Sequence, residues 1–333
     1  MLYSDTVALR YRLTMAQVRV LVFLSVAQGY CALSPAAHNH DSSSAQDALT
    51  RSAEVQSYAG STDREIAGVL MASLNDPDPL VRWEAALALA ETAQNLENAQ
   101  VRLLQSQGDA SLTRDELLAW MQSALNQPDD AQREAIADAL GHWPQQAAVQ
   151  LLRQAMHDEA ARVRASAARS LGRLGAMEAT GDLLTMLEDP ALWVRVAAAD
   201  ALGAIGDAGA VGPLASMAAQ GPVLTRVAAI SALGQLPSRE ARQRLIQCLS
   251  DESGEIRWHS ARALEQIGTV AALPGLERLL GDDYTLFDQP IHRIARSTMG
   301  AIRQREQGTW HDIRHVIFRL LGWIRRRRIL RRT

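Results

Sequence analysis

A repeat of 31 residues runs through the middle of this 333-residue chain and restricts its possible folds more than any other feature. Each copy carries an arginine and, seven residues later, a leucine. From Arg133 onward another leucine follows nineteen residues after each arginine. The arginines that mark the copies are Arg82, Arg133, Arg164, Arg195, Arg226 and Arg257. A fixed period of this size indicates a solenoid, in which each unit packs mainly against its neighbours.

The apolar pattern predicts two helices in each unit. In the copy around Arg195, apolar residues from Val194 to Ile205 recur at i, i+4, i+7, i+8 and i+11, which is one face of an α-helix. Alanine and glycine dominate this face, so we expect neighbouring helices to approach closely. Leu183 and Leu187 are one turn apart on the inner face of the second helix.

Helix ends are predicted from glycine, aspartate and proline. Gly203 and Gly206 fit a C-cap at the end of the first helix. Asp189 and Pro190, like Asp76 and Pro77, fit an N-cap followed by proline at the first helical position.

The repeat also resembles a known family. An aspartate, then a Val-Arg or Ile-Arg pair six residues on, then an alanine-rich "AAxALGxxG" stretch is similar to HEAT repeats of the short, phycobilisome-lyase type. Gln127 and Gln220 replace the aspartate in two units. In the family these positions form a ladder of polar contacts between successive repeats. The resemblance implies that structural role here for Asp76, Arg82, Arg133, Asp158, Arg164, Asp189, Arg195, Arg226, Asp251 and Arg257.

From the resemblance we expect an all-α fold, a right-handed α-α superhelix of about seven two-helix repeats. It leaves activity open, because HEAT arrays serve many functions. The array is predicted to cover residues 48–310, with an insertion around 93–110 and a longer turn at 281–291.

The N-terminal residues 1–36 are predicted to be a secretory signal peptide. Arg10, Arg12 and Arg19 precede a short apolar run from Val20 to Ala27, and Ser34 and Ala36 are spaced like a signal-peptidase site. Residues 37–47 are expected to be a flexible linker. A disordered leader on a cytoplasmic protein is the alternative.

Charge is distributed unevenly along the chain. The net charge is −3, but residues 314–333 hold eight arginines and no acid. Removing those eight from the 34 basic residues leaves 26 against 37 acidic residues, a charge of −11 for the rest. An acidic body disfavours nucleic acid as a partner, because phosphate binding needs a basic surface.

The C-terminal residues 311–333 are predicted to be a capping amphipathic helix with an arginine-rich tail. A basic amphipathic segment of this kind favours an anionic membrane surface. The candidate membrane-binding residues are Arg325, Arg326, Arg327, Arg328, Arg331 and Arg332.

Catalytic motifs are absent from the sequence: it has no phosphate-binding glycine loop, no GxSxG and no HExxH. Some HEAT-like hydroxylases bind two irons through His-Glu pairs after the ladder arginine, and no such pair occurs here. We therefore expect no cofactor, no metal and no enzymatic activity. A lone helical Cys248 is expected to be a small core residue.

Three tryptophans are the candidate partner-binding residues. Trp83 and Trp258 directly follow a ladder arginine, where the helical pattern turns them partly outward, and Trp193 lies near the same helix start. Exposed aromatics often anchor protein partners. The alternative is that these rings pack along a neighbouring repeat.

These observations predict a non-catalytic scaffold or adaptor that binds a protein partner, located in the bacterial periplasm or at its membrane after export. The alternative is a cytoplasmic lyase-like enzyme subunit with a small molecule on its concave face.

Overall fold

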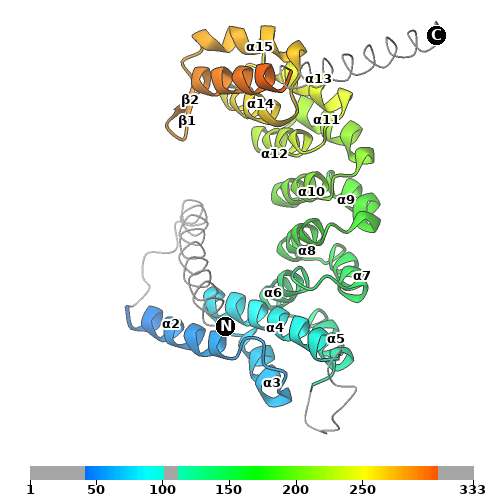
Figure 1. Ribbon diagram of the computed structural model, residues 1–333. Helices are drawn as coiled ribbons and strands as arrows, with labels where there is room; N and C mark the ends of the chain where they lie inside the picture. Colours follow the sequence, from blue (N-terminus) through cyan, green and yellow to red (C-terminus); the bar gives the residue numbers. More distant parts are fainter. Residues whose placement is uncertain (1–41, 101–111, 307–333) are drawn as a thin grey trace, which may run out of the picture. The chain divides into compact units, whose positions relative to one another are not determined.

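The computed structural model describes residues 42–100 and 112–306 (Figure 1). The chain divides into a unit that ends at Glu54 and a unit that begins at Val55. The helix α2 (Ser42–Ser57) belongs largely to the first unit, and the repeats form the second. The expected signal peptide and the expected C-terminal helix with its tail lie outside the described residues.

The second unit is built from pairs of helices that follow one another along the chain. After α3 (Arg64–Ser73), the first helices of the pairs are α4 (Pro79–Gln100), α6 (Asp130–Leu140), α8 (Ala161–Leu174), α10 (Leu192–Ile205), α12 (Val223–Gly234) and α14 (Gly254–Ile267). The second helices are α5 (Arg114–Ala124), α7 (Gln146–Ala155), α9 (Thr180–Met186), α11 (Val211–Ala219), α13 (Arg239–Cys248) and α15 (Leu273–Arg278). Short 3₁₀ turns precede or follow several second helices: Met177–Ala179, Ala208–Ala210, Val270–Ala272 and Leu279–Gly281. Residues 291–306 are also helical.

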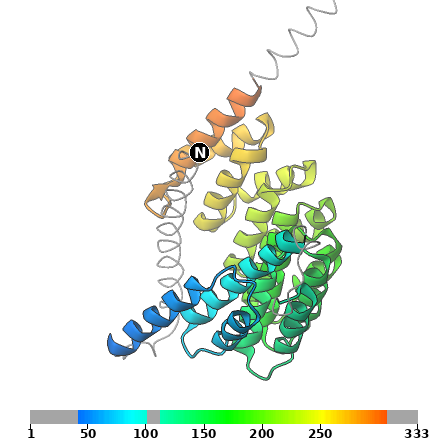
Figure 2. The same cartoon turned by 60° about the horizontal axis from the view of Figure 1, so that its bottom comes forward.

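The first helices stack directly on one another. Contacts link α6 to α8, α8 to α10, α10 to α12 and α12 to α14, and Figures 1 and 2 show these neighbours side by side. The second helices line one side of this stack in Figure 1, and each of α7, α9, α11 and α13 contacts the first helix of the following pair: α8, α10, α12 and α14. The predicted all-α solenoid is therefore confirmed.

The repeated leucines form the core, as their spacing predicts. The leucine seven residues after each ladder arginine has no exposed surface, and neither has the leucine nineteen residues after it in the regular repeats. These residues are Leu89, Leu140, Leu171, Leu202, Leu233 and Leu264 in the first helices, and Leu152, Leu183, Leu214, Leu245 and Leu276 in the second. Since the helices contact mainly their nearest neighbours along the array, the core is a continuous row of local contacts.

Glycine allows the first helices to approach closely at one repeated position. A Cβ atom at Gly172 would lie 2.6 Å from Cα of Ala201, and one at Gly203 would lie 2.8 Å from Cα of Ala232. The prediction that Gly203 belongs to the C-cap is therefore wrong, because it lies inside α10 against the next helix. Gly206 is the C-cap, as expected, with a left-handed φ of 80°.

The predicted N-cap at Asp189 lies two residues before the observed one. The helix α10 begins at Leu192 with Ala191 at its N-cap, so Pro190 is not the first helical residue. Oδ1 of Asp189 instead accepts a hydrogen bond from the backbone N–H of Ala191, at 2.8 Å, which closes a small turn before the helix.

Segments outside the regular repeat differ in part from the sequence prediction. Residues 42–47, expected to end a flexible linker, are the start of α2. The helix α4 has 22 residues against 14 in α8, so the extra residues of the insertion begin within a helix. The longer turn is a small antiparallel hairpin of β1 (Thr285–Leu286) and β2 (Gln289–Pro290).

Candidate partner-binding surface

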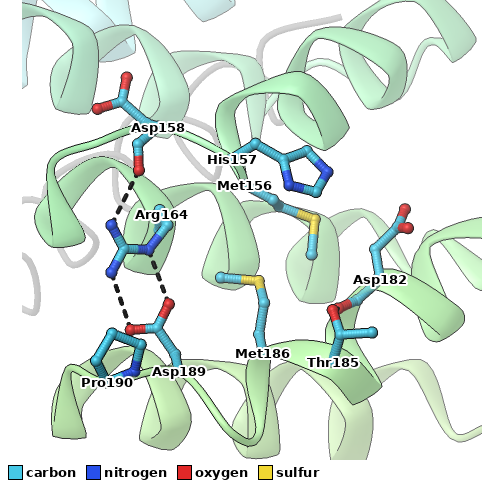
Figure 3. Close-up of a pocket in the computed structure, with 9 residues that line it drawn as sticks. All are labelled: Met156, His157, Asp158, Arg164, Asp182, Thr185, Met186, Asp189 and Pro190. Atoms are coloured by element: carbon cyan, nitrogen blue, oxygen red, sulfur yellow. Dashed lines mark hydrogen bonds and ion pairs between the residues drawn. The ribbon is translucent and has the colours of Figure 1, made fainter.

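A ladder of arginine–aspartate pairs connects successive repeats along the loops that precede the first helices. Nε and Nη2 of Arg164 donate to the two carboxylate oxygens of Asp189 at 2.8 and 2.9 Å, and Nη1 donates to the backbone oxygen of Asp158 at 2.9 Å (Figure 3). Arg133 binds Asp158 in the same two-pronged way at 2.7 and 2.9 Å. Each pair spans 25 residues, from one repeat to the next. Equivalent pairs join Arg226 to Asp251 and Arg257 to Asp282.

The electrostatics of the ladder favour the ionised aspartates. Burial opposes the charged form of Asp158, Asp189 and Asp251, but hydrogen bonds from arginine and backbone outweigh it, so the pKa of each lies below its ordinary value. For Asp282 the bond from Arg257 is the largest influence on the pKa, and it also lowers it. These charged groups therefore hold repeats together and are not available for chemistry.

The ladder is interrupted at Arg195. Its Nη1 donates to the backbone oxygens of Asp189 and Pro190, at 2.6 and 3.2 Å, as the Nη1 atoms of Arg133, Arg164 and Arg257 do to the equivalent oxygens. The residue 25 positions further on is Gln220 in place of an aspartate. Within the described part of the chain, Arg195 pairs with no carboxylate across this step.

Trp258 is not an exposed anchor, so that prediction is wrong. Its side chain is only 1% exposed, and its Nε1 donates to the backbone oxygen of Gln289 at 3.1 Å. The rings of Phe287 and Trp258 pack edge to face, with their centroids 6.4 Å apart. Cζ of Arg262 lies over the Trp258 ring, 5.4 Å from its centroid. The hairpin of β1 and β2 therefore covers the position that the helical pattern turns outward.

Trp193 is the most exposed of the three candidate tryptophans. It is 59% exposed in the first turn of α10, whereas Trp83 is half-buried. Leu224, one repeat later at the equivalent position in α12, is 51% exposed, and Val223 beside it is 38% exposed. Because α10 and α12 are in contact, equivalent positions on them are neighbours. We call Trp193, Val223 and Leu224 the apolar edge.

Charged residues occupy the same position in the flanking repeats. Arg162, one repeat before Trp193, forms an ion pair with Asp130 at 3.3 Å. Glu255 stands one repeat after Leu224. The apolar edge is therefore confined to two repeats and bordered by charge, which is the usual arrangement of a binding patch with a polar rim.

The sequence matches the model of a protein family with this repeat architecture. The profile of HEAT repeats matches residues 90–172, 115–190, 157–226 and 213–287, together more than half of the chain. The chain belongs to the HEAT-repeat family. No curated protein matches it over its sequence.

Several solved structures are similar to this HEAT array. The complex of CpcE and CpcF of phycocyanin lyase from Nostoc sp. PCC7120 is 20% identical, with a TM-score of 0.41, and the match covers 72% of this chain and 94% of that one. The protein YIBA of E. coli is 18% identical over 71% of this chain and 92% of its own, with a TM-score of 0.45. Human deoxyhypusine hydroxylase in complex with glycerol is 19% identical over 78% and 99%, with a TM-score of 0.29. These values are low, so the family assignment rests on the repeats themselves.

A cavity of about 390 Å³ opens beside the ladder, between the repeats of α7 and α9 (Figure 3). Its charged groups are already paired: Arg164 with Asp189, and Asp182 with Arg153 at 2.6 Å. What the cavity offers to a ligand is mainly one imidazole and two thioethers. The residues that line it are Met156, His157, Asp158, Arg164, Asp182, Thr185, Met186, Asp189 and Pro190.

Two features are absent from residues 42–100 and 112–306. None of the helices there has both the length and the apolar character needed to cross a membrane. No group of three or more His, Cys, Asp and Glu side chains in those ranges is arranged to hold a metal ion. Cys248 is buried, as expected of a core residue, and burial raises the pKa of its thiol.

Proposed function

We propose that this HEAT scaffold is non-catalytic and binds a protein partner at the apolar edge of α10 and α12. The observation that carries the proposal is the exposure of Trp193 and Leu224 at equivalent positions of adjacent repeats. Tryptophan has a large, rigid surface and is strongly enriched among residues that dominate binding energy. A patch of this kind on a regular array favours a partner that lies across two repeats.

The repeat does not require apolar residues at the position that Trp193 and Leu224 occupy. Position 162, in the repeat before, is an arginine, and position 255, in the repeat after, is a glutamate, so the helix start tolerates charge. Stability of the array therefore does not demand an exposed tryptophan or leucine there. Their presence supports selection for contact with something outside the array.

We extend the proposal to the bacterial cell envelope. The leader-like residues 1–36 support export to the periplasm, and the tail with Arg325–Arg328, Arg331 and Arg332 supports attachment to anionic membrane. The support here is the sequence alone. An N-terminal sequence of the native protein that begins near Ala36 is expected, whereas one that begins at Met1 or Met15 would contradict export.

The rival function is a cytoplasmic lyase-like subunit that binds a small molecule. The similarity to a phycocyanin lyase complex motivates this alternative. A chromophore that stays bound to the protein through purification would favour it over the scaffold.

The scaffold proposal is tested by site-specific photo-crosslinking in cells. A photoreactive phenylalanine analogue replaces Trp193 in one variant and Met177 in the control. Met177 has the same 59% exposure but lies at the edge where the first helices end. We expect one defined protein adduct from position 193 that disappears when Leu224 is changed to Asp, and no such adduct from position 177. Equal adducts from both positions would contradict the proposal.

A further inference from the structure

The interrupted ladder gives the apolar edge a chemical preference. Arg133, Arg164, Arg226 and Arg257 each bind the carboxylate 25 residues ahead. Arg195 has its backbone anchors, but position 220 is glutamine, so among the described residues no carboxylate pairs with its Nε and Nη2. A half-buried guanidinium with a rigid, two-pronged donor arrangement is a good carboxylate receptor.

The loop before α12 also lacks the small turn that the ladder aspartate forms in the other units. In the other units the ladder aspartate accepts the backbone N–H two residues on, such as Ala191 for Asp189 and Ser253 for Asp251. Two residues after Gln220 stands Pro222, which has no N–H. Gly221 adopts a left-handed φ of 106°, so the loop also follows a different path.

The open guanidinium and the apolar edge both belong to the starts of α10 and α12. Arg195 and Trp193 share the first turn of α10, and the loop that holds Gln220 leads directly into Val223 and Leu224 at the start of α12. One extended segment that crosses this step between repeats can therefore meet both features. It would place a carboxylate at Arg195 and an apolar side chain on the edge.

We propose that the partner segment is an acidic-apolar peptide whose aspartate or glutamate takes the place of the missing ladder aspartate at Arg195. This inference rests on the proposed function, because it names the chemistry of the same partner. The geometry expected for the bound carboxylate is that of Asp189 on Arg164, with one oxygen on Nε and the other on Nη2.

The test is a phage selection with random linear peptides on the purified protein. It is run in parallel on the wild type and on the variants Gln220→Asp, Trp193→Ala and Gln150→Asp. Gln220→Asp places a carboxylate of the chain itself at the open step. Gln150→Asp makes the same charge change at an exposed site on α7, away from the apolar edge. Melting temperatures of all four proteins verify that each variant is folded.

We expect the wild type and Gln150→Asp to enrich peptides that pair an acid with leucine or an aromatic residue. Exchange of the acid for its amide in such a peptide should weaken binding about tenfold, the effect of one charge-assisted pair. Gln220→Asp should lose this acid dependence while it still binds the amide versions.

Two failures are distinguishable. If wild type and Gln220→Asp enrich the same acidic peptides, or if the enriched peptides carry no acid, the inference is wrong while the apolar edge stands as a binding surface. If Trp193→Ala leaves the selection unchanged, or if no peptide is enriched on the wild type, the proposed function itself fails along with the inference.

Discussion

Replacing Gly203 by alanine should destabilise the array even though alanine is the better helix former. Gly203 lies within α10, where a Cβ would lie 2.8 Å from Cα and 2.9 Å from Cβ of Ala232 on α12. Carbon atoms in good contact are about 3.5–4.0 Å apart. The two helices would therefore have to separate by roughly 0.6–1.2 Å, or tilt, to accept one methyl group.

The size of the effect follows from two opposing contributions. Overpacking a close contact costs about 1–3 kcal/mol, because the neighbouring repeat must shift as a body. The change from glycine to alanine inside a helix raises the free energy of unfolding by about 1 kcal/mol, because alanine loses less backbone entropy on folding. We therefore expect Gly203→Ala to lower the free energy of unfolding by about 0–2 kcal/mol. The loss should be concentrated in α10 and α12.

The matched control is Gly68→Ala in α3, where nothing lies within 4 Å of the added Cβ. There the helix propensity acts alone, and we expect a gain of about 0.5–1 kcal/mol. Urea unfolding followed by circular dichroism gives the sign for each variant, and hydrogen exchange locates the change. If Gly203→Ala were stabilised as much as Gly68→Ala, the close approach of α10 and α12 would be refuted.

Three further outcomes are expected. Leu202→Ala should cost about 2–5 kcal/mol of unfolding free energy and raise hydrogen exchange mainly in the flanking repeats; a uniform rise over residues 50–300 would contradict nearest-neighbour packing. The ladder aspartates have a lowered pKa in the folded protein, so near that pKa they bind fewer protons when folded than when unfolded. Their contribution to the free energy of unfolding is therefore present above about pH 4 and is lost as the pH falls through the folded pKa. An acid unfolding curve of Asp189→Asn should therefore lose part of this pH dependence, and an unchanged curve would argue against the linkage. Deleting Arg325–Thr333 should abolish binding to vesicles of anionic lipid without lowering the melting temperature, and wild-type binding should weaken with salt; vesicle binding by the truncated protein would locate the contact elsewhere.

Much of the fold could be predicted because repetition amplifies a weak local signal. One stretch such as Val194–Ile205 has the pattern of an ordinary helix, but its recurrence every 31 residues identifies a solenoid. The buried leucines follow directly from their spacing, since each occupies the same place in an identical contact. The two-pronged contacts of Arg133 and Arg164 correspond to the ladder positions that the family resemblance suggested.

The errors arise where a distant segment or a neighbouring helix decides the environment. The helix pattern turns Trp258 outward, but the hairpin at 285–290 folds back over it and gives its N–H a backbone partner. Gly203 looks like a helix stop in the sequence, yet its role depends on Ala232 in the next repeat. Phe287 was not singled out, although it is 77% exposed at the hairpin tip with a left-handed φ of 50°.

The sequence shows the candidate surface only in part. Gln220 is visible as a departure from the repeat, and Trp193 as an aromatic residue at a helix start. Only the structure shows that Leu224 is exposed at the position equivalent to Trp193 on the helix that contacts α10. Only the structure shows, for the described residues, that Arg195 pairs with no carboxylate across this step. Function in a repeat protein therefore has to be sought where one unit differs from the rest.

The measurement that tests the scaffold most directly is the affinity of the crosslinked partner for Leu224→Asp compared with Met177→Asp. Both substitutions place an acid at an exposed apolar position, but only one lies on the apolar edge. A charge at the centre of an interface should weaken binding by at least about 2 kcal/mol, roughly 30-fold, while the control stays close to wild type. Equal affinities for the two variants, with both proteins folded, would show that the partner does not bind at α10 and α12.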